Sequence, residues 1–232
     1  MELKVVARVR SPFGEKFGVP RQSGLVPEVR SELVFEPAFR SAECLRGLEG
    51  FSHIWLIWGF SENEDRGWSP TVRPPRLGGN VRVGIFASRS PFRPNPLGLS
   101  CVRLLEIRLG GPEGPVLLLG GADLVDGTPV YDIKPYVAYA DSVPEASGGF
   151  TLGREPERVP VSCPEEVRAS LPAETWEALA GVLACDPRPR YHRDPDRVYG
   201  FSFAGREVRF TADAAGVHVL SVTGAALPRK GD

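Results

Sequence analysis

The sequence predicts a mainly-β chain in which a sheet-rich barrel or sandwich precedes a small α+β domain. Short runs of alternating or continuous apolar residues recur through residues 1–145, and Gly- and Pro-rich turn signals separate them. Few helical patterns interrupt this series. At residues 143–158 the composition becomes small and polar, which is typical of a linker. We therefore expect two domains, residues 1–145 and residues 146–232.

Two strands and a short helix are predicted near the N-terminus. Residues 3–10, LKVVARVR, largely alternate apolar and polar side chains, which is the period of a half-buried strand. A Gly- and Pro-rich loop follows, and residues 31–35, SELVF, are a second short strand. Residues 40–50, RSAECLRGLEG, fit a short helix with Ser41 as its cap and Gly47 as its stop.

Longer apolar runs predict the centre of the sheet. FSHIWLIWGF, residues 51–60, is continuous and indicates a central strand buried on both faces. Residues 61–80 carry several prolines and no periodicity, so they are expected to form a long loop. Residues 81–88 place alternate apolar side chains on one face of a strand. Further strands are expected at residues 101–109, 115–125 and 128–136.

The C-terminal domain combines one helical pattern with a β-hairpin. Residues 162–186 are helical in pattern, with Ser162 and Glu165 at capping-box spacing and Pro164 in the first turn. The apolar stripe of this helix could be a partner surface, but packing on its own domain is the favoured interpretation. Residues 199–210 form a hairpin that turns at Ala204 and Gly205, and residues 216–222 add a third strand. The stripe consists of Trp176, Leu179, Ala180 and Leu183.

Charge is distributed unevenly along a nearly neutral chain. The formal net charge is −1, so no global field indicates a nucleic-acid partner. Between Arg66 and Arg103, however, the chain has seven arginines and no acidic residue. Such a segment suggests an anion-binding face. The alternative is that these arginines are solvated or pair with acids elsewhere.

Cysteine usage and hydropathy favour a cytoplasmic protein. The four cysteines are far apart, with no CxxC pair and no neighbouring histidine pair, so we expect neither zinc nor any other metal. Scattered thiols fit a reducing compartment. The N-terminal stretch lacks the apolar core of a signal peptide, and the longest apolar run is too short to cross a bilayer.

Common catalytic and nucleotide-binding motifs are absent. The sequence has no GxGxxG after a strand, which removes support for a Rossmann fold, and no phosphate-binding P-loop. It also lacks HExxH and GxSxG. His53 and His218 lie in apparent strands and fit hydrogen-bonded core residues better than bases, and no nucleophilic triad can be assigned from spacing alone.

Four loop stretches carry too many special residues for simple connectors. Prolines stiffen them, so side chains on them lose little entropy on binding. Arg21, Arg89 and Arg93 suit a carboxylate, while Asp126 and Asp132 can accept hydrogen bonds from a ribose diol or an amine. Each loop alone could be a structural turn, but the four together favour a site. The stretches are SPFGEKFGVPRQSGL, WSPTVRPPRLGG, SRSPFRPNPLGLS and DLVDGTPVYDIKPY.

These stretches, together with RGLEGFSHIWLIWGF, resemble the TrmO family of tRNA methyltransferases over residues 1–145. The later stretches DPRPRYHR and VYGF resemble the smaller C-terminal domain of bacterial members. The resemblance implies a β-barrel enzyme that uses S-adenosylmethionine. It implies a homodimer with the cofactor near the subunit interface. The implied reaction is N6-methylation of threonylcarbamoyladenosine beside the anticodon of threonine tRNA.

By this resemblance, the cofactor pocket uses the RQSG stretch, the end of the long apolar strand, and the DGTPVYD loop. Some relatives carry His-Gln where this chain has Ser61 and Glu62, so the contact there must differ or involve the backbone. The implied cofactor-binding residues are Arg21, Gln22, Ser23, Gly24, Phe60, Ser61, Glu62, Arg89, Leu99, Asp126, Gly127, Thr128, Pro129, Val130 and Tyr131.

The expected chemistry is direct methyl transfer, in which positioning supplies most of the catalysis. The attacking nitrogen needs an orienting group and a proton acceptor, for which the candidates are Asp126, Asp132 and Tyr136. Two other functions fit the same pocket: an S-adenosylmethionine-binding sensor and a small-molecule methyltransferase. The residues expected to bind the tRNA substrate are Arg73, Arg76, Arg93 and Lys134.

Overall fold

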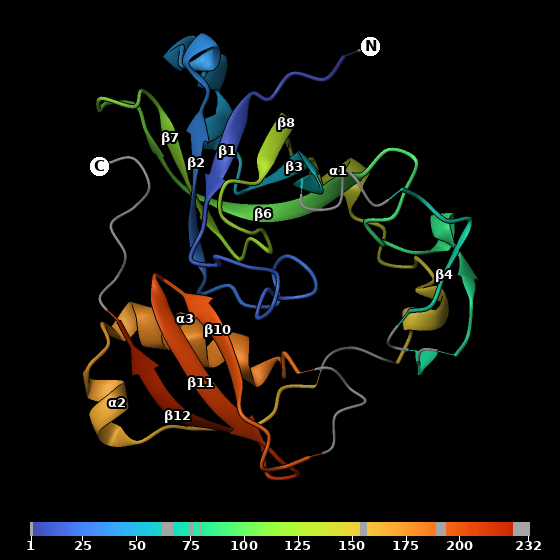
Figure 1. Cartoon of the computed structure of the whole chain (residues 1–232). Helices are drawn as coiled ribbons and strands as arrows, with labels where there is room; N and C mark the ends of the chain where they lie inside the picture. The colour runs from blue at the N-terminus through green and yellow to red at the C-terminus, as the bar shows by residue number, and fades with distance from the viewer. Residues whose placement is uncertain are drawn as a thin grey trace.

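A closed β-barrel forms the larger part of the computed structural model, which describes residues 2–61, 67–74, 77–78, 80–153, 157–188 and 194–224 (Figure 1). Its strand order is β1-β2-β7-β6-β3-β8, and every neighbouring pair is antiparallel. The mainly-β barrel is therefore confirmed. The strands are β1 (Ala7–Arg10), β2 (Arg30–Phe35), β3 (His53–Gly59), β6 (Leu97–Arg108), β7 (Val116–Gly120) and β8 (Pro129–Pro135).

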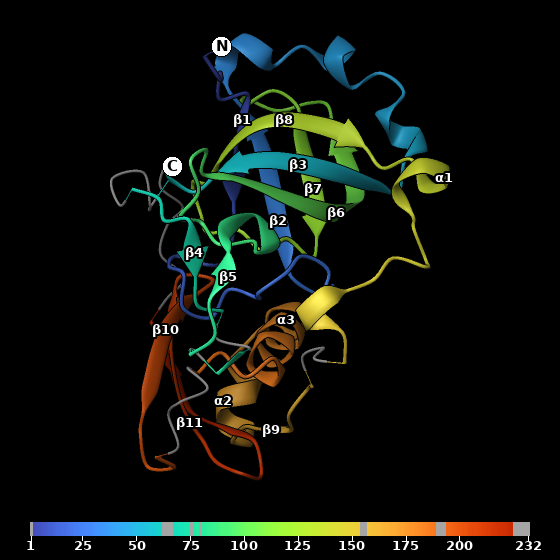
Figure 2. The ribbon, with the colours of Figure 1, turned by 90° about the vertical axis from the view of Figure 1, so that its right-hand side faces the viewer.

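The barrel core follows from side-chain alternation on the strands. Ile54 and Leu56 of β3 are fully buried and pack with Leu33, Leu117 and Leu119 from facing strands. The prediction that β3 is buried on both faces is wrong, because the side chains on its outer face are partly exposed. A closed barrel has one packed interior, and Figure 2 shows the outer face of β8, β3 and β6 with no helix lying across it.

The segment expected to be a strand at residues 81–88 is only partly extended. β5 (Val83–Gly84) pairs with β4 (Thr71–Val72), and a 3-10 turn, η6 (Ile85–Ala87), follows at once. The backbone turns because the Ile85 N–H bonds to the Pro70 carbonyl and its side chain is buried. We call the described residues between 67 and 96 the arm, since in Figure 1 they extend to one side of the barrel.

The predicted helix at residues 40–50 is a series of 3-10 turns. η1 (Pro37–Phe39), η2 (Ala42–Leu45) and η3 (Leu48–Gly50) follow one another. Ser41 precedes η2 as expected, but its side chain makes no capping hydrogen bond. Gly47 has φ +86° and separates the last two turns, so the stop signal was correct while the helix type was wrong.

The C-terminal sheet has the order β10-β11-β12-β9. The predicted hairpin and third strand are confirmed, and Ala204 and Gly205 both have positive φ, as a type I′ turn requires. In addition, β9 pairs in parallel with β12. The strands are β9 (Val161–Ser162), β10 (Tyr199–Phe203), β11 (Arg206–Ala212) and β12 (Val217–Thr223).

The predicted C-terminal helix is divided in two by Pro172. α2 (Glu165–Ala169) ends before it and α3 (Ala173–Ala184) begins after it. The capping box is wrong, because Ser162 lies in β9 and Pro164 occupies the cap position. Leu179 and Leu183 are buried in the core of their own domain, which confirms the favoured interpretation of the stripe. Two further short helices of the described residues are the α-helix α1 (Ala138–Asp141) and the 3-10 helix η7 (Gly149–Thr151).

The described residues contain no helix with both the length and the apolar character needed to span a bilayer. Over the same residues, no three His, Cys, Asp or Glu side chains gather in a group able to hold a metal ion. All four cysteines have free thiols.

Candidate functional site

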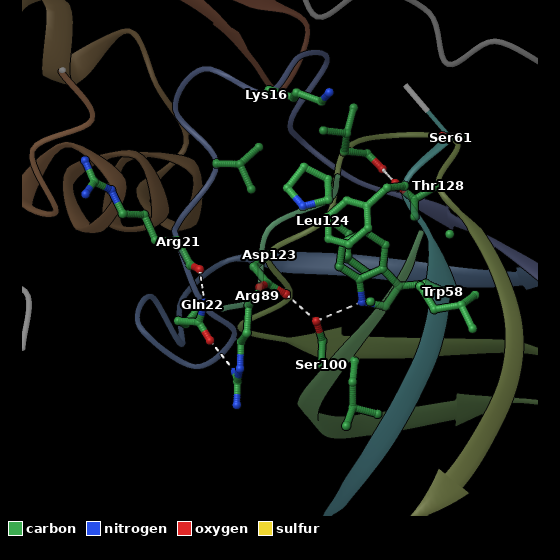
Figure 3. A pocket seen from close by; sticks show the side chains of 18 of the residues that line it. Lys16, Arg21, Gln22, Trp58, Ser61, Arg89, Ser100, Asp123, Leu124 and Thr128 are labelled. Atoms are coloured by element: carbon green, nitrogen blue, oxygen red, sulfur yellow. Dashed lines mark hydrogen bonds between the residues drawn. The ribbon is translucent and has the colours of Figure 1, made fainter. Parts of the chain in front are cut away.

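A cavity of about 500 Å³ opens at the end of the barrel where β3 finishes and β6 begins (Figure 3). Three of the four special loop stretches supply its wall. The described residues of the fourth, WSPTVRPPRLGG, do not line it. The predicted site residues at this cavity are Arg21, Gln22, Phe60, Ser61, Arg89, Arg93, Leu99, Asp126, Gly127 and Thr128.

A chain of hydrogen bonds crosses the cavity wall (Figure 3). Trp58 Nε1 donates to Ser100 Oγ at 3.0 Å, and Ser100 Oγ donates to Asp123 Oδ1 at 2.7 Å. Burial raises the pKa of the Asp123 carboxyl, while the bonds from Ser100 and from the Ser23 N–H, and the charge of Arg89, act in the opposite direction. A carboxyl group with a shifted pKa that lines a cavity is typical of a functional site.

The loop that carries Asp126 is held by the first strand and its extension. The N–H of Gly127 bonds to the Val9 carbonyl at 2.8 Å, and the N–H of Asp126 bonds to the Phe13 carbonyl at 2.8 Å. Asp126 Oδ1 in turn accepts the Ser11 N–H at 2.9 Å. Asp126 is therefore a fixed, solvent-exposed carboxylate at the cavity, in contrast to the more deeply placed Asp123.

Two arginines of the arm have different tasks. Arg89 donates to the side-chain oxygen of Gln22, so this pair links the arm to the β1–β2 loop at the cavity. Arg93 donates to the carbonyls of Ser88 at 2.6 Å and Ile85 at 3.2 Å. Its guanidinium thus fastens the loop that presents Arg89.

Several predicted cofactor residues support the cavity from behind. Ser23 bonds to Asp123 through its backbone, and the Gly24 N–H bonds to the Gly121 carbonyl at 2.8 Å. Val130 is buried in the barrel core. The Tyr131 hydroxyl would lie 2.6 Å from a Cβ at Gly59, so it packs under the end of β3. Pro129 pairs with Arg8 at the start of β8.

The remaining predicted residues lie elsewhere. Asp132 Oδ2 pairs with Lys134 Nζ at 2.9 Å, and neither residue lines the cavity. Tyr136 packs on Trp55, with ring centroids 5.9 Å apart. Arg73 is exposed on the arm. Glu62 and Arg76 lie outside the described residues.

Sequence reasoning missed Lys16, Trp58, Ser100 and Asp123, all of which line the cavity. A signal existed for Asp123, which is the acidic residue that follows the apolar run of β7 after two glycines and an alanine. No such signal existed for Trp58, because an aromatic residue near a strand end is as typical of a core position as of a binding site. Ser100 occupies a position of β6 whose side chain faces inward by strand alternation, but nothing else in the local sequence indicates a site residue.

The two histidines in the described part of the chain, His53 and His218, both make side-chain hydrogen bonds. His53 bonds to Ser52 Oγ at 2.9 Å but is partly exposed, so its placement in the core was wrong. His218 is also partly exposed, so its placement in the core was wrong as well, but it is hydrogen-bonded as expected: it bridges Ser162 Oγ at 2.7 Å and Asp213 Oδ1 at 3.0 Å. Asp213 Oδ1 also accepts the backbone N–H groups of Ala215 and Gly216 in the turn before β12, so this cluster of hydrogen bonds links β9 to β12.

Both halves of the chain match models of one family. The tRNA-methyltransferase O N-terminal domain matches residues 8–142, and the TrmO C-terminal domain matches residues 156–225. A tRNA (adenine(37)-N6)-methyltransferase of Escherichia coli (strain K12) is 42% identical over 230 residues, which are 95% of this chain and 97% of the relative.

Two further relatives agree with this match. A putative S-adenosylmethionine-dependent methyltransferase, RcsF, of Pseudomonas aeruginosa is 43% identical over 203 residues, 84% of this chain and 85% of the relative. The crystal structure of TrmO from Pseudomonas aeruginosa superposes with a TM-score of 0.76 at 34% identity, covering 97% of this chain and 99% of that one.

Proposed function

The chain belongs to the tRNA-methyltransferase O family, and on this premise we propose that it N6-methylates threonylcarbamoyladenosine beside the anticodon of threonine tRNA. It is an S-adenosylmethionine-dependent tRNA adenine-N6 methyltransferase, and the finer substrate is the proposal. The observation that carries it is the convergence of three family-like loops on one cavity with a carboxyl and a guanidinium in its wall.

The cavity fits S-adenosylmethionine in size and in chemistry. Its volume lies in the ~300–1,000 Å³ range of small-molecule sites. Trp58, Leu99 and Leu124 supply apolar wall for an adenosine moiety. Asp123 can accept hydrogen bonds from ribose hydroxyls or an amino group, and Arg89 suits a carboxylate. When bound, the cofactor supplies an electrophilic sulfonium methyl group that passes directly to the N6 nitrogen.

The residues of the chain then have to orient one nitrogen and remove one proton. Asp126 is the favoured acceptor, because it is exposed at the cavity and its orientation is fixed by the Ser11 N–H. Asp132 becomes the weaker candidate, since its carboxylate is paired with Lys134 away from the cavity wall. Arg73, on the exposed arm, is suited to tRNA phosphates.

We also propose that the enzyme is a cytoplasmic homodimer. The arm and the adjoining barrel face carry exposed apolar side chains, including Phe86 at 80% exposure and Leu99 at 53%, which a second copy of the chain could cover. Because Leu99 also lines the cavity, a second copy seated here would help to enclose the cofactor. Sedimentation equilibrium at micromolar concentration tests this, and a monomer mass would contradict it.

The decisive experiment is methyl transfer from labelled S-adenosylmethionine to threonine tRNA, with and without the threonylcarbamoyl group, followed by nucleoside mass analysis. We expect label in N6-methylated threonylcarbamoyladenosine, and only with the modified tRNA. Cofactor binding with no transfer to any tRNA would favour the sensor function. Turnover of a small molecule in the absence of tRNA would favour the small-molecule methyltransferase.

Gly98→Ala is expected to close part of the cavity. A Cβ at this position would lie 2.2 Å from the Trp58 ring, so the indole must move, and we expect its bond to Ser100 to be lost. We expect weaker binding of S-adenosylmethionine in calorimetry. Gly50→Ala is the matched control, because a Cβ there meets nothing within 4 Å. Equal affinity in the two variants would contradict the placement of the cofactor against Trp58.

A further inference from the structure

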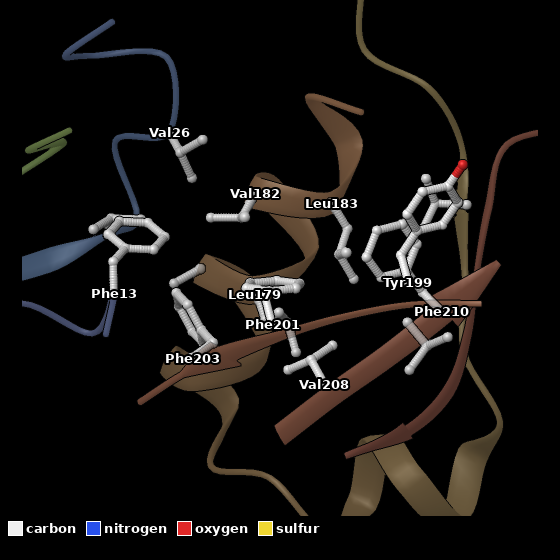
Figure 4. Packing of buried hydrophobic residues seen from close by; sticks show 14 of the residues in the cluster. Phe13, Val26, Leu179, Val182, Leu183, Tyr199, Phe201, Phe203, Val208 and Phe210 are labelled. Carbon is white, nitrogen blue, oxygen red and sulfur yellow. The ribbon is translucent and has the colours of Figure 1, made fainter. Parts of the chain in front are cut away.

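The β1–β2 loop, residues 11–29, is part both of the cavity wall and of the C-terminal hydrophobic core. One set of its side chains, including Lys16 and Gln22, lines the cavity. Another set, Phe13, Val26 and Val29, is buried in the hydrophobic core of the C-terminal domain. Figure 4 shows Phe13 and Val26 reaching from this loop toward α3 and the C-terminal strands. The loop is therefore a shared layer between the cavity and the C-terminal core.

Aromatic contacts hold the loop on strand β10. Phe13 is fully buried and packs edge-to-face on Phe203, with centroids 5.5 Å apart. Phe17 lies among three rings of the C-terminal sheet, at 6.1 Å from Phe201, 6.3 Å from Tyr199 and 6.4 Å from Phe210. Aromatic pairs of this kind contribute beyond their buried area, so the C-terminal sheet holds the loop in addition to its hydrogen bonds with the barrel.

Three hydrogen bonds add to this attachment. The Ala204 N–H bonds to the Pro12 carbonyl at 2.7 Å, and the Ser202 N–H bonds to Glu15 Oε1 at 3.1 Å. Farther along the loop, Arg158 Nη2 donates to the Leu25 carbonyl at 2.8 Å. The loop is thus anchored before and after the residues that face the cavity.

Single residues of the loop separate the cavity from the C-terminal core. Val19 packs on the C-terminal core and also lines the cavity. Gly18 has φ +92°, and a Cβ there would lie 2.5 Å from the Phe201 ring, so the backbone itself rests on that ring. We therefore expect a shift of Phe201 or Phe17 to displace the cavity wall at Val19.

We propose that Phe17 is a positioning residue for the cofactor, through which the packing of the C-terminal sheet sets the affinity for S-adenosylmethionine. This inference rests on the proposed function of the cavity. Phe17 does not line the cavity, and its effect is to hold the backbone of residues 16–22 at the distance that the cofactor requires. The C-terminal domain is then a structural part of the cofactor site, whatever else it binds.

The first test measures S-adenosylmethionine affinity by calorimetry in the full-length Phe17→Ala variant. We expect the dissociation constant to rise about 3- to 30-fold, the usual range for substitutions that act through packing. Phe17→Leu keeps an apolar side chain on the sheet and is expected to recover most of the affinity. Val217→Ala is the control. It also removes side-chain volume from the C-terminal core, but it lies on β12, two strands from β10.

The second test uses the reciprocity of coupled sites. If cofactor binding is linked to packing on β10, saturating S-adenosylmethionine should slow hydrogen exchange of the β10 amides in the wild-type protein and less so in Phe17→Ala. If Phe17 is only structural, Phe17→Ala lowers the stability of the protein, but saturating S-adenosylmethionine slows exchange of the β10 amides to the same extent in both proteins.

The outcomes separate this inference from the proposed function. A wild-type protein that binds no S-adenosylmethionine would refute the function of the cavity. If the wild type binds but folded Phe17→Ala binds equally well, the positioning role is refuted. The same holds if Val217→Ala loses as much affinity as Phe17→Ala, because general loosening of the domain then explains the effect.

Discussion

Asp126→Asn should slow methyl transfer about 10²- to 10⁴-fold, the usual contribution of a positioned proton acceptor, with cofactor affinity nearly unchanged. The Asn side chain keeps the oxygen that accepts the Ser11 N–H, so the loop should retain its conformation. Only the capacity to take a proton is removed. Single-turnover rates at saturating S-adenosylmethionine, combined with calorimetric binding, measure the two effects separately.

Asp132→Asn is the companion variant for this experiment. Its carboxylate pairs with Lys134 and does not line the cavity, so we expect transfer close to the wild-type rate. A large loss in Asp132→Asn with a small loss in Asp126→Asn would reverse the assignment. It would imply that substrate reaches the outer face of β8.

Asp123→Asn is expected to weaken S-adenosylmethionine binding about 10- to 100-fold. Hydrogen bonds to a charged group contribute roughly 1.5–3 kcal/mol, and the Ser100 hydroxyl fixes the carboxylate that would make them. Calorimetric titration of both proteins measures the difference. Unchanged affinity, with a slow transfer step, would instead make Asp123 the proton acceptor.

The same variant gives a stability prediction with a definite sign. Burial raises the pKa of Asp123 above its ordinary value in the folded protein. Its contribution to stability is therefore complete below the unfolded-state pKa and decreases as pH rises through the folded-state pKa. Asn does not titrate, so the wild type should gain stability relative to Asp123→Asn as pH falls from neutral toward the ordinary pKa of an aspartate. Urea unfolding at several pH values measures this, and the opposite slope would contradict it.

The fold was predictable where local pattern and packing agree. Alternation in β1 and in the β10–β11 hairpin matches the side chains that the structure buries, and the Ala204–Gly205 turn needed only its local sequence. Closure of the barrel was not predictable in this way. It depends on β1 pairing with β8, a contact between residues more than a hundred positions apart. The two-sided burial of β3 was predicted because continuous apolar sequence does not distinguish a covered sheet from an open one.

The site was predictable at the level of loops rather than of atoms. Stiff, proline-rich stretches marked Arg89 and Asp126, which the structure places at the cavity. They also marked Arg93, but a guanidinium satisfies backbone carbonyls as well as anions, and only the folded loop shows which it does here. Asp123 acquires its character from burial and from Ser100, which lie outside its local sequence.

The shared loop also constrains the order of events during synthesis. Phe13 and Phe17 are synthesised 190 and 193 residues before their respective ring partners Phe203 and Phe210. At ~5–20 residues per second, these partners follow roughly 10–40 s later. During that interval the barrel strands can pair, but the loop has no core to bind. The nascent chain therefore exposes two phenylalanines beside the barrel until β10 and β11 have been made, and, on the proposed role of Phe17, full affinity for the cofactor arises only then.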